Sequence, residues 1–314
     1  MPKHFLSTKD LNPDIVDQLL SKANWLKSNK DSLADLGLLK GKILLNLFYE
    51  SSTRTRLSFE IAAKLLGADF INFNPDLSSL AKGESFEDTA YTLSQLEIDL
   101  AIIRHSEGGA AQKLAYYLNQ YNQEKNISVI NAGDGISEHP TQALLDFYTI
   151  VSNCPNSSVK GKQIVIIGDC LHSRVARSNI YLLKSLGAKV KCIAPESMIS
   201  AEFVEMGAEL DHDLINGLKN ADFIIVLRIQ KERLKQEFNL DLETYKQDFC
   251  VTEEKLKKAN LNLNFVKLLH PGPVNRNIEI SENLINHPIS LINQQVNNGV
   301  FIRMAVLWYL LGHK

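Results

Sequence analysis

The stretch KILLNLFYESSTRTRLSFEIAAKLLG, from Lys42 to Gly67, decides the fold that we expect. Its apolar run from Ile43 to Phe48 is typical of a buried parallel strand. After a polar turn, apolar side chains recur at helical spacing, at Leu57, Ile61, Ala62, Leu65 and Leu66. Gly67 stands where a helix needs a C-cap. The stretch therefore predicts a strand, a turn and a helix in immediate succession.

The turn itself is rich in groups that bind anions. Hydroxyls and arginines gather there, at Ser51, Ser52, Thr53, Arg54, Thr55 and Arg56. A helix start offers backbone N–H groups without partners and the positive end of the helix dipole. Capping by Ser52 or Thr53 is the simpler interpretation, but the set exceeds what a cap needs. We predict a site for a phosphate-like dianion that uses Arg54, with Arg56 in a structural role. It is not a P-loop, because no G-x-x-x-x-G-K-S/T pattern is present.

Length and composition indicate an ordinary globular protein. The chain has 314 residues, which suggests about two domains. Hydrophobic residues make up 45% and charged residues 22%. With 34 Lys and Arg against 36 Asp and Glu, the net charge is -2. No global field therefore favours nucleic acid or an anionic membrane as a partner, and any use of arginine against anions must be local.

The cysteines and histidines argue against a disulfide scaffold or a metal site. Four cysteines occur without a C-x-x-C pair, at Cys154, Cys170, Cys192 and Cys250. They are expected to be buried fillers, and Cys170 is only a weak candidate for a nucleophile. The eight histidines form no metal-binding pattern, so no metal is expected. The N-terminus has no apolar signal core and no run approaches a membrane span. A soluble, cytoplasmic protein is the expectation.

Strand and helix patterns alternate along the whole chain. Strands are expected over residues 43–48, 68–73, 100–104, 128–131, 163–167, 189–193, 223–227 and 265–269. The main helices are expected from Pro13, from Ser85 to Leu96, over 109–121, 141–151 and 174–186, and from about Gly299. The last of these should bury Val300, Phe301, Met304, Leu307, Trp308 and Leu311. The alternation predicts an α/β fold of two domains, each with a mostly parallel sheet flanked by helices.

Polar residues follow several of these strands, where α/β sheets bind ligands. They include Ser78, Ser79, Lys82, Arg104, His139, Gln142, Arg174, Arg228, Gln230 and the run His270–Pro271–Gly272–Pro273. Singly, Lys82 is more often a solvated loop lysine, and His139 more often a cap or loop residue. Arg104 is equally an edge residue or a ligand. Together they predict a pocket for a small polyanion, and the partial echo of a nucleotide-binding turn after Gly168 is weak.

The motifs match a known family in order along nearly the whole chain. The matching motifs are STRTR-x-SFE, SSLAKGE, IRH, GDGISEHPTQALLD, LRIQKER, HPGPVNR and QVNNGVFIRMAVL. The chain thereby resembles the catalytic chains of aspartate carbamoyltransferases, within the wider transcarbamylases. SSLAKGE, with its lysine, and RIQKER favour the aspartate branch, and HPGP stands where ornithine enzymes have a cysteine-containing motif.

The resemblance implies a role for each candidate residue. Carbamoyl phosphate would be bound by Ser52, Thr53, Arg54, Thr55, Arg104, His139, Gln142, Gly272 and Pro273. Of these, Arg54, Thr55, Arg104 and His139 would be catalytic. L-Aspartate would be bound by Lys82, Arg174, Arg228 and Gln230. Ser78, or alternatively Ser79, and Lys82 would come from a neighbouring subunit of a homotrimer.

The resemblance also implies the domain limits, the reaction and the partners. Residues 1–144 plus 292–314 would form the carbamoyl-phosphate-binding domain and residues 145–291 the aspartate-binding domain, with the active site in the crevice between them and at a subunit interface. The reaction would yield N-carbamoyl-L-aspartate and phosphate for pyrimidine synthesis, without a cofactor. A regulatory chain or a dihydroorotase would be a possible further partner.

Three alternatives stay open on the sequence alone. The chain could be another transcarbamylase that acts on ornithine or a related amine. It could be a Rossmann-type oxidoreductase, although the G-x-G-x-x-G motif is missing. It could also be a silent scaffold subunit, although no site arginine, His139 or Lys82 is lost.

Overall fold

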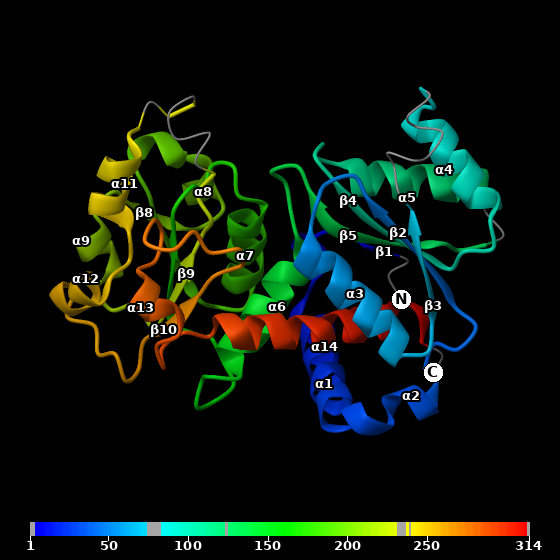
Figure 1. The fold of residues 1–314 in the computed structure, drawn as a ribbon, viewed down its shortest axis with the longest axis horizontal. Coiled ribbons are helices and arrows are strands. Elements are labelled where there is room, and N and C mark those ends of the chain that lie inside the picture. Colours follow the sequence, from blue (N-terminus) through cyan, green and yellow to red (C-terminus); the bar gives the residue numbers. More distant parts are fainter. Residues whose placement is uncertain (1–3, 74–82, 123–124, 231–236, 239, 313–314) are drawn as a thin grey trace. The chain divides into compact units, whose positions relative to one another are not determined.

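The computed structural model describes residues 4–73, 83–122, 125–230, 237–238 and 240–312. Within these ranges the chain forms two parallel sheets of five strands each, flanked by helices (Figure 1). The predicted α/β fold class is therefore confirmed. The chain divides into two compact units, Met1–Leu144 with Asn297–Lys314, and Leu145–Val296. The boundary after Leu144 falls within the helix Pro140–Val151, and the boundary after Val296 falls within the helix Ile292–Leu311. Each of these two helices therefore contributes residues to both units.

The sheet of the first unit has the strand order β1-β5-β4-β2-β3, and every pairing in it is parallel. Its strands are β1 (His4–Phe5), β2 (Ile43–Phe48), β3 (Asp69–Phe73), β4 (Leu100–His105) and β5 (Ser128–Asp134). The central strands β2, β4 and β5 are apolar along most of their length and buried, as expected for strands covered on both faces. Phe48 pairs with Arg104, so the ends of β2 and β4 lie side by side.

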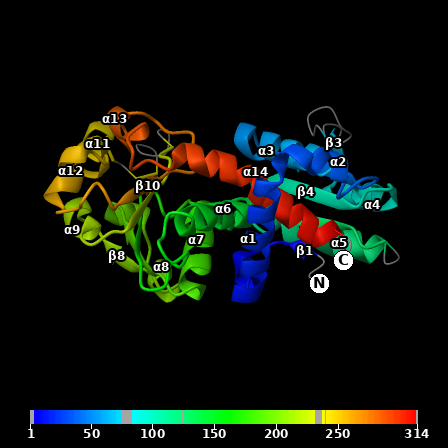
Figure 2. The same cartoon turned by 90° about the horizontal axis from the view of Figure 1, so that it is seen from below.

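Helices cover both faces of this sheet (Figures 1 and 2). They are α1 (Pro13–Ser28), α2 (Leu33–Leu36), α3 (Thr53–Leu65), α4 (Phe86–Gln95), α5 (Ala110–Tyr121), the start of α6 (Pro140–Val151) and most of α14 (Ile292–Leu311). One core cluster joins α4 and α5 to β2, β4 and β5. Side chains cap the N-termini of α1 and α4, because Asn12 accepts the Ile15 N–H and Ser85 accepts the Asp88 N–H.

The second unit repeats the design with its own sheet, ordered β10-β9-β6-β7-β8 and again wholly parallel. Its strands are β6 (Gln163–Ile167), β7 (Lys189–Ile193), β8 (Glu209–Asp211), β9 (Phe223–Val226) and β10 (Lys267–Leu269). Its helices are α7 (Arg174–Ser185), α8 (Glu202–Glu205), α9 (Leu214–Leu218), α11 (Leu242–Phe249), α12 (Glu253–Lys258) and α13 (Glu282–Ile285). Among the described residues, no helix is long and apolar enough to cross a membrane.

The structure corrects several predicted boundaries, and two of them have a clear physical reason. The last helix begins at Ile292 rather than near Gly299, because hydrogen bonds of a buried glutamine and not an apolar stripe hold its first turns in place. The Gln295 side chain, for example, donates to the Asp146 carboxylate and accepts the His270 N–H. The strand expected from Phe265 begins at Lys267, because Phe265 closes a turn on Asn262 and is 78% exposed.

Several elements escaped the sequence analysis altogether. The charged stretch from Lys231 to Lys258 contains α11 and α12, which are capped by Asp241 and Thr252. Short β1 was also missed, because two residues give no period that distinguishes a strand. The last helix buries three of its six predicted apolar residues, whereas Val300, Trp308 and Leu311 are only half-buried.

Candidate active site

The turn after β2 presents its hydroxyls and arginines as the sequence predicts. Ser52 is the N-cap residue of α3, but its side chain makes no capping hydrogen bond to the helix. Simple capping therefore does not explain this serine. Thr55 is buried in the first turn, and its carbonyl accepts the Ser58 hydroxyl at 3.0 Å. Arg54 is exposed on the same turn.

Arg56 has a different partner from the one that an anion site would give it. Its Nε donates to the Asn72 side chain on β3 at 3.1 Å, and Asn46 of β2 donates to the same oxygen at 2.8 Å. Arg56 thus joins the helix to the sheet edge, which agrees with the structural role expected for it.

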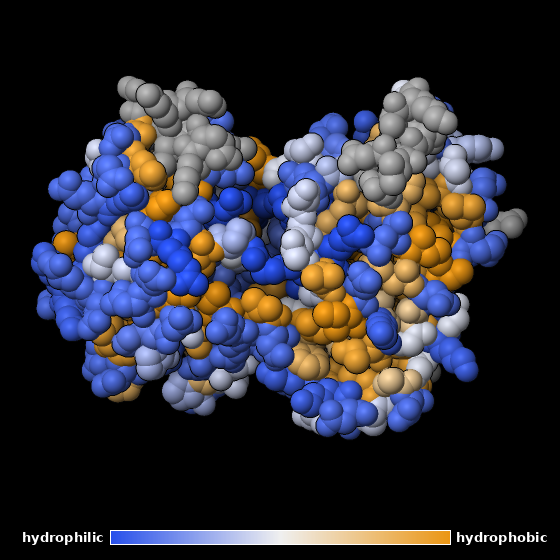
Figure 3. Space-filling view, in the orientation of Figure 1, coloured by the Kyte–Doolittle hydropathy of each residue, from blue (hydrophilic) through white to orange (hydrophobic). Residues whose placement is uncertain are grey.

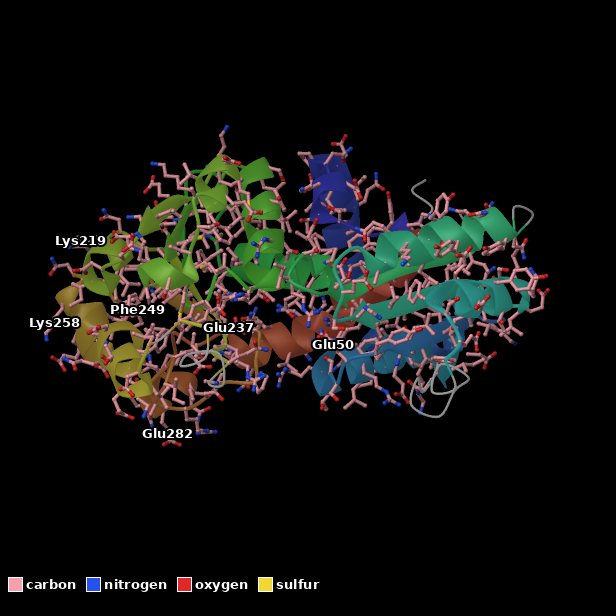
Figure 4. The ribbon with its side chains drawn as sticks, turned by 90° about the horizontal axis from the view of Figure 1, so that it is seen from above. Glu50, Lys219, Glu237, Phe249, Lys258 and Glu282 are labelled. Atoms are coloured by element: carbon pink, nitrogen blue, oxygen red, sulfur yellow. The ribbon has the colours of Figure 1, made fainter. Side chains whose placement is uncertain are left out.

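Arg104 ends β4 beside the turn. Its Nη1 donates to the Ala132 carbonyl on β5 at 3.3 Å, and its Nε lies 3.4 Å from the Glu50 carboxylate (Figure 4). Glu50 follows β2 directly, so the two residues come from adjacent strands. The sequence analysis assigned no role to Glu50. The opposite charges of the two side chains attract each other beside the turn.

The loop between β5 and α6 holds His139 in a buried position. Glu138, just before it, accepts hydrogen bonds from the Ser7 hydroxyl at 2.5 Å, the Thr8 N–H at 2.8 Å and the Thr8 hydroxyl at 2.6 Å. The Asp134 carboxylate accepts the Glu138 N–H at 3.1 Å and the Gly109 N–H at 2.8 Å. These buried acids were also missed from the sequence, because their partners lie far away in the chain.

Gln142 lies one helical turn after His139. The Gln142 N–H donates to the His139 carbonyl at 2.9 Å, and both side chains are buried. The three-residue spacing therefore places both residues at the start of α6, as predicted. Since β5, β4 and β2 are adjacent and parallel, their carboxyl ends lie side by side at the same end of the sheet. The first unit therefore has the turn, Arg104 and the His139 loop at that end of the sheet.

The second unit makes a comparable arrangement with β10, β9 and β6. Arg174 is the first residue of α7 after β6, and the Ser173 hydroxyl caps that helix by accepting the Ala176 N–H. Arg228 follows β9 and is exposed, whereas the intervening Ile229 is buried and Gln230 half-buried. Gly272 and Pro273 follow β10 and are joined by a cis peptide bond. The three strands are parallel neighbours, so these segments lie at the carboxyl end of the second sheet.

Two predicted residues, Ser78 and Lys82, lie outside the described residues, as does Ser79. In the part of the chain that the structure describes, no group of three or more His, Cys, Asp or Glu side chains could hold a metal ion. Cys170 is fully buried, and a hydrogen bond with Cys192 and burial together raise its thiol pKa well above the ordinary value. A protonated, inaccessible thiol is a poor nucleophile, so Cys170 has the properties of a buried filler.

The environment of Tyr49 shows how closely side chains pack at the carboxyl end of the first sheet. Its ring lies 4.8 Å from the His105 ring and 6.2 Å from the Phe86 ring. Its N–H donates to the Arg104 carbonyl at 2.9 Å. Burial, helped by the negative charge of Glu84, raises the pKa of Tyr49 to about 12. The phenol is therefore neutral throughout the physiological range.

Two parallel sheets with basic and hydroxyl side chains after their strands are typical of α/β enzymes that act on small anionic ligands. The chain belongs to the aspartate/ornithine carbamoyltransferase family. Its residues 3–152 match the family's carbamoyl-P binding domain, and residues 160–310 match the Asp/Orn binding domain. The resemblance seen in the motifs is therefore confirmed.

Relatives with curated names match nearly the full length of the chain. The aspartate carbamoyltransferase catalytic subunit of Granulibacter bethesdensis is 44% identical over 97% of this chain and 93% of its own length. That of Desulfitobacterium hafniense strain DCB-2 is 43% identical over 99% of this chain and 96% of its own.

Solved structures of the same family share the fold. Aspartate transcarbamoylase from Trypanosoma cruzi, in complex with carbamoyl aspartate and phosphate, has a TM-score of 0.85 at 29% identity and covers 98% of this chain and 96% of its own. The catalytic subunit of M. Jannaschii aspartate transcarbamoylase has a TM-score of 0.81 at 32% identity and covers 98% of both chains.

Proposed function

We propose that this chain transfers the carbamoyl group of carbamoyl phosphate to the α-amine of L-aspartate. The products would be N-carbamoyl-L-aspartate and phosphate. The reaction would be an early step of pyrimidine synthesis in the cytoplasm. The near-full-length likeness to aspartate carbamoyltransferase catalytic subunits supports this reaction. The T. cruzi relative has been solved with carbamoyl phosphate and aspartate together, at a TM-score of 0.84.

The observation that best supports this function is that three adjacent strands of the first sheet are followed by groups suited to anion binding. Ser52, Thr53, Arg54 and Thr55 would hold the phosphate, since N–H groups, hydroxyls and a guanidinium all point to a dianion there. Arg104 and His139, with Thr55, would polarise the carbonyl oxygen. Gln142 and the backbone of Gly272 and Pro273 would hold the amide. Apart from Gly272 and Pro273, these residues lie in the predicted carbamoyl-phosphate-binding domain, residues 1–144 plus 292–314.

The second sheet would supply the aspartate site, in the domain predicted to span residues 145–291. Arg174 and Arg228 would bind the two carboxylates of aspartate, with Gln230 in support and Lys82 from a neighbouring subunit. A dicarboxylate next to a phosphate brings several negative charges together, and arginines offset the repulsion between them. Two arginines that follow the adjacent strands β6 and β9 therefore suit a dicarboxylic amino acid better than ornithine, whose side chain is cationic.

The chemistry needs no cofactor and no covalent enzyme intermediate. The neutral α-amine of aspartate attacks the carbonyl carbon of carbamoyl phosphate, and the developing oxyanion meets Thr55, Arg104 and His139. The C–O bond to phosphate then breaks, and phosphate departs onto the turn around Arg54. Holding the two substrates at attack distance supplies much of the rate enhancement. We propose that the departing phosphate takes the amine proton, since the sequence identifies no general base.

A homotrimer with shared active sites is part of this proposal. Leu57 and Ile61 of α3 and Ile71 of β3 are exposed, although their spacing alone would suit a buried face. Hydrophobic side chains gather over α3 and β3 in the space-filling view (Figure 3). Apolar surface of this kind marks an interface with another chain, and a second copy would also bring Lys82 and Ser78 to the site. A regulatory chain or a dihydroorotase would be a further partner of such a trimer.

Turnover of carbamoyl phosphate with aspartate, and then with ornithine, tests the reaction. Ureido product is expected with aspartate only, and product with ornithine only would overturn the proposal. Mixing of two inactive variants, Arg54→Ala and Lys82→Ala, tests the shared site. Mixed trimers contain sites with both native residues, so activity should reappear on mixing. A fully active monomer would contradict the trimer.

A further inference from the structure

The second unit contains a buried pair, His270 and Glu279, to which the proposed reaction assigns no role. Neither side chain is exposed to solvent, and Nε2 of His270 lies 3.3 Å from Oε1 of Glu279. Burial of a carboxylate is costly unless hydrogen bonds replace the lost water. The pair lies directly beside the loop that contains Gly272 and Pro273, so its contacts show what it holds in place.

Two hydrogen bonds determine how the histidine is used. The Gly272 N–H donates to Nδ1 of His270 at 2.8 Å, so that nitrogen carries no proton. Nε2 therefore carries the proton and donates to Glu279. The same Glu279 oxygen accepts the Asn275 N–H at 3.0 Å. One carboxylate oxygen thus fixes the loop at both ends, through His270 before Gly272 and through Asn275 after Pro273.

Asn275 extends this control to the neighbouring segment. Its side-chain amide donates to the Ile229 carbonyl at 2.9 Å. Ile229 lies between Arg228 and Gln230, the two residues proposed to bind aspartate after β9. The loop that would hold the carbamoyl amide and the segment that would hold aspartate are therefore linked by a single side chain.

Glu279 and His270 are themselves anchored on their other sides. The Glu279 carbonyl accepts the Val251 N–H at 2.9 Å, within a bridge between Val251 and Ile280. The His270 N–H donates to Gln295, whose amide donates to the Asp146 carboxylate at 2.7 Å. The pair is thus part of the rigid interior of the second unit, which suits it to set the positions of exposed segments.

We infer that Glu279 is a positioning residue, which holds the loop 270–273 and the segment 228–230 in one relative arrangement through His270 and Asn275. This role rests on the proposed function, because it assigns the two segments to carbamoyl phosphate and to aspartate. A purely apolar core would stabilise the fold at least as well as a buried carboxylate does. What the carboxylate adds is a fixed geometry for two site segments at once.

Three variants and one control test this role, with steady-state kinetics for both substrates and thermal unfolding of the trimer. Asn275→Ala removes only the link to Ile229, and the side chain is half-buried, so the fold should persist. We expect the KM for aspartate to rise about tenfold and the KM for carbamoyl phosphate to stay within about twofold, as for one lost hydrogen bond. Glu279→Ala should raise both KM values by about tenfold or more and lower kcat.

Glu279→Gln is the conservative rescue, because its amide oxygen still accepts from His270 and Asn275. Its KM values should stay within about threefold of the unchanged protein. Glu282→Gln is the matched control, since Glu282 lies three residues further on at the surface and pairs with Arg276 at 2.7 Å (Figure 4). It should change neither KM.

The outcomes separate positioning from a merely structural role. If Glu279→Ala lowers the melting temperature and the activity but leaves both KM values unchanged, the inference is overturned. If that variant fails to fold, an unchanged aspartate KM in Asn275→Ala overturns it instead. Normal turnover by the unchanged protein shows that such a result counts against Glu279 and not against the proposed reaction. No turnover of carbamoyl phosphate with aspartate by the unchanged protein would overturn both.

Discussion

The Thr8 hydroxyl donates to the Glu138 carboxylate at 2.6 Å, although 130 residues separate the two along the chain. The Thr8 N–H donates to the same oxygen at 2.8 Å, and the Ser7 hydroxyl donates to the other oxygen at 2.5 Å. Both Thr8 and Glu138 are buried. The N-terminal segment therefore supports the loop that ends in His139, one of the residues proposed to polarise the carbonyl group.

Thr8→Val should destabilise the protein while keeping its shape. Valine matches threonine in volume but cannot donate, so a buried carboxylate loses one of its three hydrogen bonds from this segment. A hydrogen bond to a charged group contributes about 1.5–3 kcal/mol to the free energy of unfolding. Urea unfolding measures the difference. Thr244→Val, at an exposed threonine of α11, is the control and should stay within about 0.5 kcal/mol; an equal loss in both variants would contradict the role of the Glu138 contact.

Arg54→Ala should lower kcat/KM by about 10²–10³, the usual effect of one lost charge-stabilising donor at a reacting centre. The side chain is exposed, so its removal leaves no cavity. Arg56→Ala is the matched control from the same helix, because Arg56 binds Asn72 and not the proposed phosphate position. It should keep kcat/KM within about threefold. Full turnover by Arg54→Ala would refute the assignment of the turn.

The four thiols should be unreactive in the native protein. All four cysteines are buried. Burial raises the pKa of the Cys154 thiol, and it raises that of Cys250 to about 11. Since the thiolate is the reactive form, a coloured disulfide reagent at pH 8 should detect almost no thiol within minutes. In denaturant the same reagent should count four. Rapid reaction of a native thiol would show that one of these sites opens readily.

Stability should fall at alkaline pH in part through Tyr49. Its pKa is raised to about 12 in the folded protein, first by burial and then by Glu84, against an ordinary value of 10.0. Above pH 10 the unfolded chain releases this proton while the folded protein keeps it, so stability falls with pH until about 12. Tyr49→Phe should reduce that slope in urea unfolding between these limits.

The exposed Tyr116 provides the comparison for this pH dependence. Tyr116→Phe should keep the alkaline slope of the unchanged protein. An equal change of slope in the two variants would show that Tyr49 has no special share in the alkaline transition.

Much of the fold was predictable because its signals are local. The strands at 163–167 and 189–193 agree with β6 and β7 residue for residue, since the first is a mostly apolar run and the second begins with alternating polar and apolar residues. The start of the last helix was not predictable. Its residues 292–298 lack an apolar stripe, and the buried Gln295 among them is held by hydrogen bonds with Asp146 and His270. Similarly, Leu57 and Ile61 follow a helical period but face outward.

The candidate site shows the same division. Hydroxyls, arginines and the H-P-T-Q motif are visible in the sequence because the chemistry of an anion demands those side chains at the ends of strands. Glu50, Glu138 and Glu279 gave no comparable signal, since an isolated glutamate in a polar segment is usually a solvated residue. Their partners are Arg104, the Ser7–Thr8 segment, and His270 with Asn275.

The sequence by itself determined the family, the alternation of strands and helices, and the residue types that we propose to bind the substrates. These follow from local periodicity and from motifs in which each residue acts on a ligand. Only the tertiary structure decided which acids hold those residues in place. A buried carboxylate is stable only where distant parts of the chain bring donors to it, and that arrangement exists only after the sheets have formed.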